Sequence, residues 1–351
     1  MKAVPKIPIQ NIYYLLCYAW NKLEERNIVD VSGIESTSVL DLFAKVLIGG
    51  LKHLFKRGID RGYVTYAEDT RCLRGKICFA PTIKRNLLMK AQVFCEYDEL
   101  NHNVLHNQII KASLGSLIRV EGLNTELKDE LIGLYRKLQE IDDIQLSSAI
   151  FSRVQLHRNN AFYDFLLKIC ELIYDNLLIT EDPGKSKFRD FLQDEKKMAY
   201  LFEEFVRNFY KMEAKGCNVR REDIYWDATP LDELSKALLP KMITDISVER
   251  NGSKVVIETK YYKKALVSHY GLEKYHSKHF YQLFSYLKNL EAKGGANKKC
   301  SGVLLYPTVD KEIKGEGLEM GGHKVMVRTI NLNQDWSLIH RDLIELIERA
   351  L

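Results

Sequence analysis

The chain has 351 residues, a length that favours two domains, and its 46% apolar and 28% charged residues are enough for ordinary hydrophobic cores. No apolar run approaches the ~20 residues of a membrane-spanning helix, and the N-terminus lacks a secretion-signal pattern. We therefore expect a cytoplasmic protein without a membrane partner. The net charge of +5 is compatible with DNA binding but too small to indicate it. The seven cysteines, an odd number without C-x-x-C spacing, predict reduced thiols.

The first half of the chain is typical of a helix-rich platform with an inserted β element. Apolar residues recur at helical spacing in five segments. These segments are residues 9–25, 39–56, 103–120, 125–139 and 162–178. Two other segments, 63–67 and 91–97, are rich in residues that favour strands. Between them, the basic segment 71–79 is either a loop that reaches a partner or a solvated turn, and no catalytic group is predicted in residues 1–180.

A polar segment at residues 180–187 contains both proline and glycine and is the best domain boundary. We therefore predict domains at 1–185 and 186–351. The sequence Gly-Lys-Ser at 184–186 resembles the end of a phosphate-binding P-loop. That motif also needs a glycine where this chain has Ile179, and a strand where a helix is predicted, so we expect no nucleotide-hydrolysing site.

The second half alternates helices and strands. Residues 197–212 predict an amphipathic helix whose buried stripe includes Phe202, Phe205 and Phe209. Further helices are predicted at 275–290 and 337–350, strands at 301–306 and 324–330, and a glycine-rich loop at 312–322.

The most informative stretch is a predicted hairpin before the second of these helices. An Asn-Gly pair at 251–252 separates two strand-like runs and indicates a type I′ turn. If these two residues form the loop, Asp245 lies opposite Glu258. Lys260, two residues beyond Glu258, then projects from the same face of the strand. Because like charges opposite each other on a sheet repel, this pair of carboxylates is expected to hold a cation between them.

Oxygen ligands at this spacing suit Mg²⁺, which usually takes one or two carboxylates and completes its shell with water and substrate phosphate. A lysine beside the carboxylates can orient the attacking water or stabilise charge on a pentavalent phosphate. The alternative is a solvated, charged hairpin face, because acidic and lysine residues are common on hairpins.

The helix that follows the hairpin changes the balance between these alternatives. Its Gln282-x-x-x-Tyr286 sequence resembles an element of the RecB-like PD-(D/E)xK nucleases, and the order strand, strand, helix, strand resembles the core of those enzymes. In that superfamily an acid on the first helix often supports the metal. Glu203 occupies the corresponding place here, although a solvated acid is the commoner role for such a residue.

Matching segments over nearly the whole chain resemble the McrC family, the nuclease subunits of McrBC methylcytosine-dependent restriction systems. The matching segments are Ile-Pro-Ile-Gln-Asn-Ile-Tyr-Tyr-Leu-Leu at 7–16, Leu-Asn at 100–101, Asn-Gln-Ile-Ile-Lys at 107–111, Leu-Pro-Lys-Met-Ile-Thr-Asp-Ile at 239–246, Lys-Tyr-Tyr-Lys at 260–263 and Tyr-Gln-Leu at 281–283. One departure is Glu258, where relatives are expected to carry aspartate.

The resemblance implies a mixed α+β fold, with a helix-rich N-terminal domain that contains a β insertion and a C-terminal αβββαβ nuclease domain of the PD-(D/E)xK superfamily. It also implies that Mg²⁺ is bound by Asp245 and Glu258, with help from the Thr259 carbonyl. Lys260 would act on the water or the phosphate. Gln282 and Tyr286 would position that lysine or the DNA backbone. No organic cofactor is expected.

The resemblance further implies a role in phage defence as a type IV restriction endonuclease subunit. Its partner would be an McrB-like AAA+ GTPase ring, which recognises modified cytosine in double-stranded DNA and whose GTP hydrolysis the N-terminal domain would stimulate. Cutting both strands would need two copies of the nuclease domain. The rival hypothesis is a non-catalytic assembly subunit whose nuclease fold only docks DNA or the ring.

Overall fold

We describe the protein from a computed structural model. It describes residues 7–23, 38–160, 162–179, 186–261, 266–269, 272–308, 313 and 315–351. The chain forms two compact units, which we treat separately. Residues 38–189 form the helical unit, and residues 7–23 together with 190–351 form the sheet unit. All seven cysteines are free thiols, as predicted.

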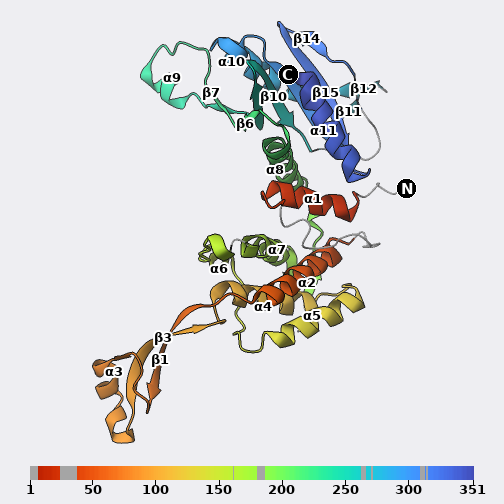
Figure 1. The fold of residues 1–351 in the computed structure, drawn as a ribbon. Coiled ribbons are helices and arrows are strands. Elements are labelled where there is room, and N and C mark those ends of the chain that lie inside the picture. The colour runs from red at the N-terminus through yellow and green to blue at the C-terminus, as the bar shows by residue number, and fades with distance from the viewer. Residues whose placement is uncertain are drawn as a thin grey trace. The chain divides into compact units, whose positions relative to one another are not determined.

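The helical unit is built on four helices whose apolar stripes pack on one another (Figure 1). They are α2 (Val39–Arg57), α4 (Leu105–Ile118), α5 (Thr125–Lys137) and α7 (Phe162–Asn176). Ser38 caps α2 by accepting a hydrogen bond from the Asp41 N–H, and Gly58 ends it with a φ of 91° that favours glycine. Gly50 inside α2 lets α7 pack closely, because a Cβ there would lie 2.3 Å from a terminal methyl of Leu166 and would force that side chain to shift.

The predicted β element is present in the same unit as β1 (Gly62–Thr70) and β3 (Val93–Asn101), which pair antiparallel along their whole length. The basic segment between them includes the short strand β2 (Lys76–Ile77), which pairs with β3, and leads into α3 (Phe79–Lys84). Gly75 precedes β2 with a φ of 59°, and a Cβ there would lie 2.4 Å from the Glu96 carbonyl oxygen.

Short elements complete the helical unit and correct one expectation. They are α6 (Ser148–Phe151), β4 (Leu177–Ile179) and β5 (Ser186–Phe188), and β4 pairs with β5. A strand therefore follows α7 where the sequence predicted only helix. The P-loop pattern still lacks its first glycine at Ile179. The rest of the predicted boundary, at 180–185, lies outside the described residues.

The sheet unit contains a six-stranded mixed sheet in the order β14-β15-β13-β10-β9-β6. The strands are β6 (Asn218–Arg220), β9 (Ile246–Arg250), β10 (Ser253–Thr259), β13 (Ser301–Thr308), β14 (Leu318–Met320) and β15 (His323–Asn331). The central strands β10, β13 and β15 run parallel, whereas β9, β6 and β14 are antiparallel to their neighbours. β14 lies within the segment predicted to be a glycine-rich loop. It forms because a two-residue turn at Gly321 and Gly322, both with positive φ, folds it back onto β15, with which it pairs antiparallel.

Helices cover both faces of this sheet (Figure 1). α10 (Ser277–Glu291) packs on the face that presents Val256, Leu304 and Val327. α8 (Glu195–Glu213) and α11 (Trp336–Ala350) lie on the other face, where Trp336 packs against Phe205. Each of these helices was predicted from the sequence, α8 and α10 from their apolar stripes.

The first helix, α1 (Ile9–Ala19), belongs to the sheet unit although it opens the chain. It packs along α8, where the ring of Tyr18 contacts Phe205 and Phe209. The Asn11 side chain donates hydrogen bonds of 2.8 Å to two backbone carbonyls after β15. The predicted line at 185/186 lies near the change of unit, but α1 was expected with the N-terminal domain.

Besides β6 and β14, other short described elements of the sheet unit were not predicted. They include β7 (Asp223–Ile224), α9 (Glu233–Leu238), β8 (Met242–Ile243), β11 (Leu266–His269) and β12 (Leu272–Tyr275). The fold is thus a mixture of helices and a mixed sheet, as expected. None of the described helices is long and apolar enough to cross a membrane.

Candidate active site

The predicted hairpin forms with the predicted register. Asn251 adopts a φ of 50° and Gly252 one of 79°, as a type I′ turn requires, and Arg250 pairs with Ser253. The ladder continues to Ile246 opposite Ile257. The next residue toward the N-terminus is Asp245, whose N–H donates to Glu258 Oε1 at 3.2 Å. Local turn chemistry therefore brings together the two acids that the sequence singled out.

Asp245 is half-buried and its carboxylate is oriented from one side. Its Oδ2 accepts hydrogen bonds from the Thr259 N–H at 2.8 Å and the Thr259 hydroxyl at 2.9 Å. Its Oδ1 makes no hydrogen bond to any described residue, so this oxygen is available to a ligand. The predicted role of the Thr259 carbonyl stays a prediction.

Glu258 is fully buried, and three donors surround its carboxylate. Besides the Asp245 N–H on Oε1, Lys260 Nζ at 2.9 Å and Gln282 Nε2 at 3.0 Å both donate to Oε2. Burial and the nearby charge of Asp245 raise the pKa of Glu258 to about 7, although Lys260 opposes this change. A carboxylate has about four lone-pair directions, so one remains for a further ligand.

Lys260 projects from the same face as Glu258, as predicted. Burial alone would lower its pKa, but the charges of Glu258 and Asp245 outweigh burial and raise the pKa above its usual value. The lysine is therefore a protonated donor at neutral pH and not a general base. It lies between Glu258 and the pocket described below.

Gln282 and Tyr286 extend this network from α10. Gln282 Nε2 donates to Glu258 and, at 2.9 Å, to the Tyr286 hydroxyl, which in turn donates to the Ile243 carbonyl at 3.1 Å. Gln282 thus contacts the same oxygen as Lys260 and makes no hydrogen bond to the lysine. All six predicted site residues therefore belong to one cluster, whose chemical roles remain predictions.

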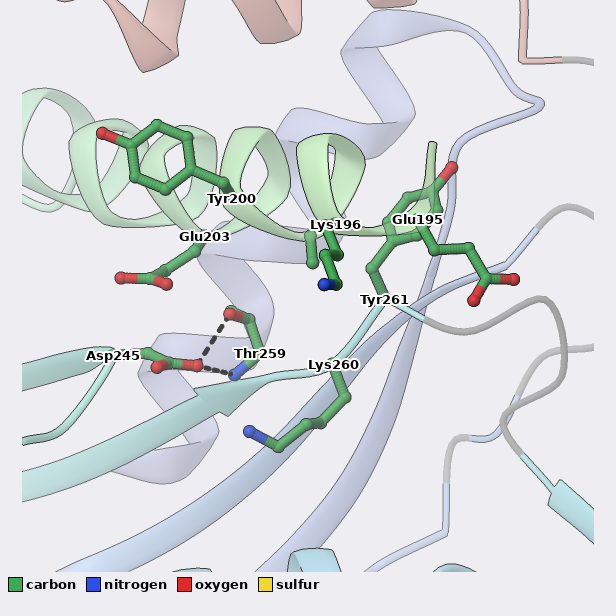
Figure 2. A pocket seen from close by; sticks show the side chains of 9 residues that line it. Glu195, Lys196, Tyr200, Glu203, Asp245, Thr259, Lys260 and Tyr261 are labelled. Atoms are coloured by element: carbon green, nitrogen blue, oxygen red, sulfur yellow. Dashed lines mark hydrogen bonds between the residues drawn. The ribbon is translucent and has the colours of Figure 1, made fainter. Parts of the chain in front are cut away.

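A pocket of about 410 Å³ opens beside this cluster. Figure 2 shows Asp245, Thr259 and Lys260 on its sheet side, with Lys196 and Glu203 projecting from α8. Burial and then the Asp245 charge raise the pKa of Glu203. The negative charge of Asp245 therefore disfavours ionisation of Glu203 across the pocket.

The acids of this cluster fit Mg²⁺. They are hard oxygen ligands, and burial first and the Asp245 charge second raise the pKa of Glu258, an effect that a bound cation would oppose. Among the described residues no group of three or more histidine, cysteine or acidic side chains forms a complete metal site. Water and substrate oxygens would have to complete the shell, which is usual for Mg²⁺.

Known proteins resemble this chain along its whole length. The profile of the family described as McrBC 5-methylcytosine restriction system component matches residues 4–307. A protein of Escherichia coli (strain K12), named type IV methyl-directed restriction enzyme EcoKMcrBC, is 35% identical over 347 residues, which are 99% of each chain. This chain belongs to the McrC family of McrBC system components. The family expected from the sequence is confirmed.

Two solved structures also resemble the chain. One is the refined half-complex from the tetradecameric assembly of Thermococcus gammatolerans McrB AAA+ hexamers with bound McrC. It matches 98% of this chain and 76% of the solved chain with a TM-score of 0.61 and 17% identity, which indicates a common fold. The cryo-EM structure of the Thermococcus gammatolerans McrBC complex matches 59% of each chain with 22% identity and a TM-score of 0.43.

Sequence reasoning missed the residues that support this cluster from a distance. Arg207 of α8 donates to the Asp245 carbonyl at 3.3 Å, and Thr244 exchanges hydrogen bonds of 3.0 Å with the backbone of Glu222. Glu222 also pairs at 2.6 Å with Lys254, whose side chain is buried. The only available signal for Arg207 was a charged residue one helical turn after Glu203.

Proposed function

We propose that this chain is the Mg²⁺-dependent DNA endonuclease subunit of a modification-dependent restriction complex. The observation that carries the proposal is the cluster in which buried Glu258 accepts hydrogen bonds from the Asp245 N–H and from Lys260, while Asp245 and Lys260 themselves line a pocket. These residues occupy the D…(D/E)-x-K spacing of the PD-(D/E)xK nucleases. The element order α8, β6, β9, β10, α10, β13 supports the αβββαβ core.

Each side chain has a defined task in phosphodiester hydrolysis. Asp245 and Glu258 would hold Mg²⁺, which when bound lowers the pKa of coordinated water and stabilises charge on the phosphate. Lys260 donates a hydrogen bond to the attacking water or to a phosphate oxygen. Gln282 orients the Glu258 carboxylate by donating a hydrogen bond to it. Tyr286 holds the backbone before Asp245 by donating a hydrogen bond to the Ile243 carbonyl.

The names of the relatives support the rest of the proposal. The Escherichia coli relative is named as a methyl-directed restriction enzyme, and the Thermococcus gammatolerans structure contains McrB AAA+ hexamers with bound McrC. We infer that this chain works with an McrB-like AAA+ GTPase ring on double-stranded DNA that carries modified cytosine. The helical unit would bind the ring and stimulate GTP hydrolysis, and two nuclease copies would cut the two strands. The complete acid and lysine set argues against a non-catalytic assembly subunit.

The test is DNA cleavage by the complex reconstituted with its AAA+ partner. Asp245→Ala, Glu258→Gln and Lys260→Ala should each reduce cleavage by at least about 100-fold, the scale of removing one charge-stabilising group. Lys241→Ala is the matched control, because Lys241 lies near the same hairpin but pairs with Asp223 on the surface. A folded Asp245→Ala protein that cuts DNA at the wild-type rate would refute the proposal.

A further inference from the structure

Arg207 is a buried arginine behind the candidate active site, with 6% of its surface exposed. Its Nη1 donates to Glu203 Oε1 at 2.8 Å and to the Asp245 carbonyl oxygen at 3.3 Å. Its Nη2 pairs with Glu204. One guanidinium therefore connects two acids of α8 with the backbone of an acid that precedes β9.

The backbone that carries Asp245 is held by a contact from each surrounding element. Tyr286 of α10 binds the Ile243 carbonyl, the Glu222 backbone holds Thr244, and Glu258 of β10 accepts the Asp245 N–H. Arg207 supplies the contact from α8. The distance between α8 and this segment determines how the Glu203 and Asp245 carboxylates face each other across the pocket.

The distance between α8 and this segment matters because Glu203 and Asp245 each have one carboxylate oxygen that accepts no hydrogen bond from a described residue. Hydrogen bonds to described residues engage Glu203 only through Oε1 and the Asp245 carboxylate only through Oδ2. The second oxygen of each acid is left for the pocket that both residues line. Two like charges this close repel, and a buried cation behind both lowers the cost of holding them together.

We propose that Arg207 is a positioning residue of the nuclease site, which sets the Glu203 carboxylate of α8 against Asp245 so that both present an oxygen to the same divalent cation or its water ligands. This inference rests on the function proposed above. Arginine is required because its planar fork reaches three acceptors at fixed angles, whereas the single ammonium of lysine cannot. Partners that orient metal ligands typically change metal affinity 10- to 100-fold when they are removed.

The alternative is a purely structural salt bridge that fastens α8 to the sheet. Such a bridge would lower the melting temperature when it is broken but would leave the metal requirement unchanged. Metal dependence therefore separates the two roles. Arg221 is the matched control, because it approaches the same Glu203 oxygen at 3.5 Å from an exposed position and makes no hydrogen bond to Asp245.

The experiment compares Arg207→Lys with Arg221→Lys in two assays. The first is the Mg²⁺ concentration that gives half-maximal DNA cleavage by the reconstituted complex. The second is the Ca²⁺ concentration that gives half of the rise in melting temperature of the full chain alone. Arg207→Lys should raise both concentrations about tenfold or more, and Arg221→Lys less than about twofold. Arg207→Lys with wild-type values in both assays would overturn the proposal.

Glu203→Gln keeps the test decisive if Arg207→Lys does not fold. Glu203→Gln should itself raise the Ca²⁺ requirement, and an unchanged requirement would show that Arg207 has no ligand to position there. In the folded double variant, Arg207→Lys should add less than its effect in the wild-type background, because the two residues act together. If the wild-type chain responds to Ca²⁺ but cuts no DNA, the nuclease proposal fails, and the Ca²⁺ comparison of Arg207→Lys with Arg221→Lys alone decides whether Arg207 positions a metal ligand. If the complex cuts DNA but the chain shows no response to Ca²⁺, the positioning proposal is overturned and the nuclease proposal is not.

Discussion

Glu258 is the residue on which the contacts of the site converge, and its burial gives the protein a specific pH dependence. In the folded chain its pKa is about 7, above the usual value of 4.5, because burial and the Asp245 charge disfavour ionisation. Between these two pH values the folded state binds the extra proton, so the free energy of unfolding falls as pH rises from about 4.5 to about 7. Above pH 7 the penalty is complete.

Glu258→Gln has no proton to lose and should lack this component. Without divalent metal, the melting temperature of Glu258→Gln relative to the wild type should therefore rise as pH increases from 5 to 7.5. Glu249→Gln is the control, because Glu249 lies on the same hairpin with a partly exposed side chain and pairs with Arg220, whose charge does not change over this range. A difference between Glu258→Gln and wild type that stays constant over this range would contradict the assigned pKa.

At the residue scale, the sequence predicted those site residues that lie close together along the chain. Asp245, Glu258 and Lys260 lie on one hairpin, whose register is determined by the Asn251-Gly252 turn. Arg207 was not predictable in the same way. It lies 38 positions before Asp245, and the contact depends on how α8 packs on the sheet. A sequence pattern within one helix does not report such packing.

The turn and ladder of the β9–β10 hairpin bring the two acids together. A divalent cation that binds only the folded state should therefore stabilise it. We expect Mg²⁺ or Ca²⁺ at a hundred times its dissociation constant to add roughly 2.7 kcal/mol to the free energy of unfolding, measured by urea denaturation. The double variant Asp245→Ala/Glu258→Ala should show no such gain. An equal gain in that variant would place the cation elsewhere.

Helix α8 carries Glu203 and Arg207, and its start is fixed by a cap. The Asp194 carboxylate accepts hydrogen bonds from the N–H groups of Lys196 at 3.1 Å and Lys197 at 3.2 Å. Asp194→Ala should lower the free energy of unfolding by about 1 kcal/mol in urea denaturation, whereas Asp194→Asn, which keeps an acceptor oxygen, should lose much less. Equal losses for both variants would show that the cap bonds do not account for the effect.

At the element scale, long amphipathic helices and strands were predictable, and short elements were not. α8, α10 and α11 have apolar stripes several turns long, which specify a helix whatever its surroundings. β4 and β14 have three residues each and exist because a neighbouring strand supplies their hydrogen bonds. Such elements are determined by tertiary pairing more than by their own residues.

At the scale of the whole molecule, the two structural units do not follow each other along the chain. The sheet unit contains α1 from the start of the chain as well as residues 190–351. The sequence recorded the apolar stripe of α1 but not its partner, since the partners lie nearly 200 positions away on α8. A truncation after the helical unit would therefore separate α1 from the helix on which it packs. Functions of the two units are better separated by point variants of the full chain.

The proposed division of labour gives the last prediction. The predicted metal ligands and lysine all lie in the sheet unit, and we propose that the N-terminal half contacts the AAA+ partner. Asp245→Ala should therefore raise the GTPase rate of an McrB-like partner to the wild-type level and yet leave DNA uncut. Arg74→Ala is the converse variant, because Arg74 belongs to the predicted basic contact segment and packs over the Tyr97 ring.

Arg74→Ala should reduce stimulation of GTP hydrolysis while the Ca²⁺-induced rise in melting temperature stays at the wild-type value, since the proposed metal ligands belong to the other unit. GTP turnover, DNA cleavage and the melting temperature are measured side by side for the wild type and both variants. Normal stimulation by Arg74→Ala would remove this arginine from the contact but leave the division intact. If folded Asp245→Ala loses stimulation together with cleavage, the division is wrong, because the nuclease site itself then takes part in activating the partner.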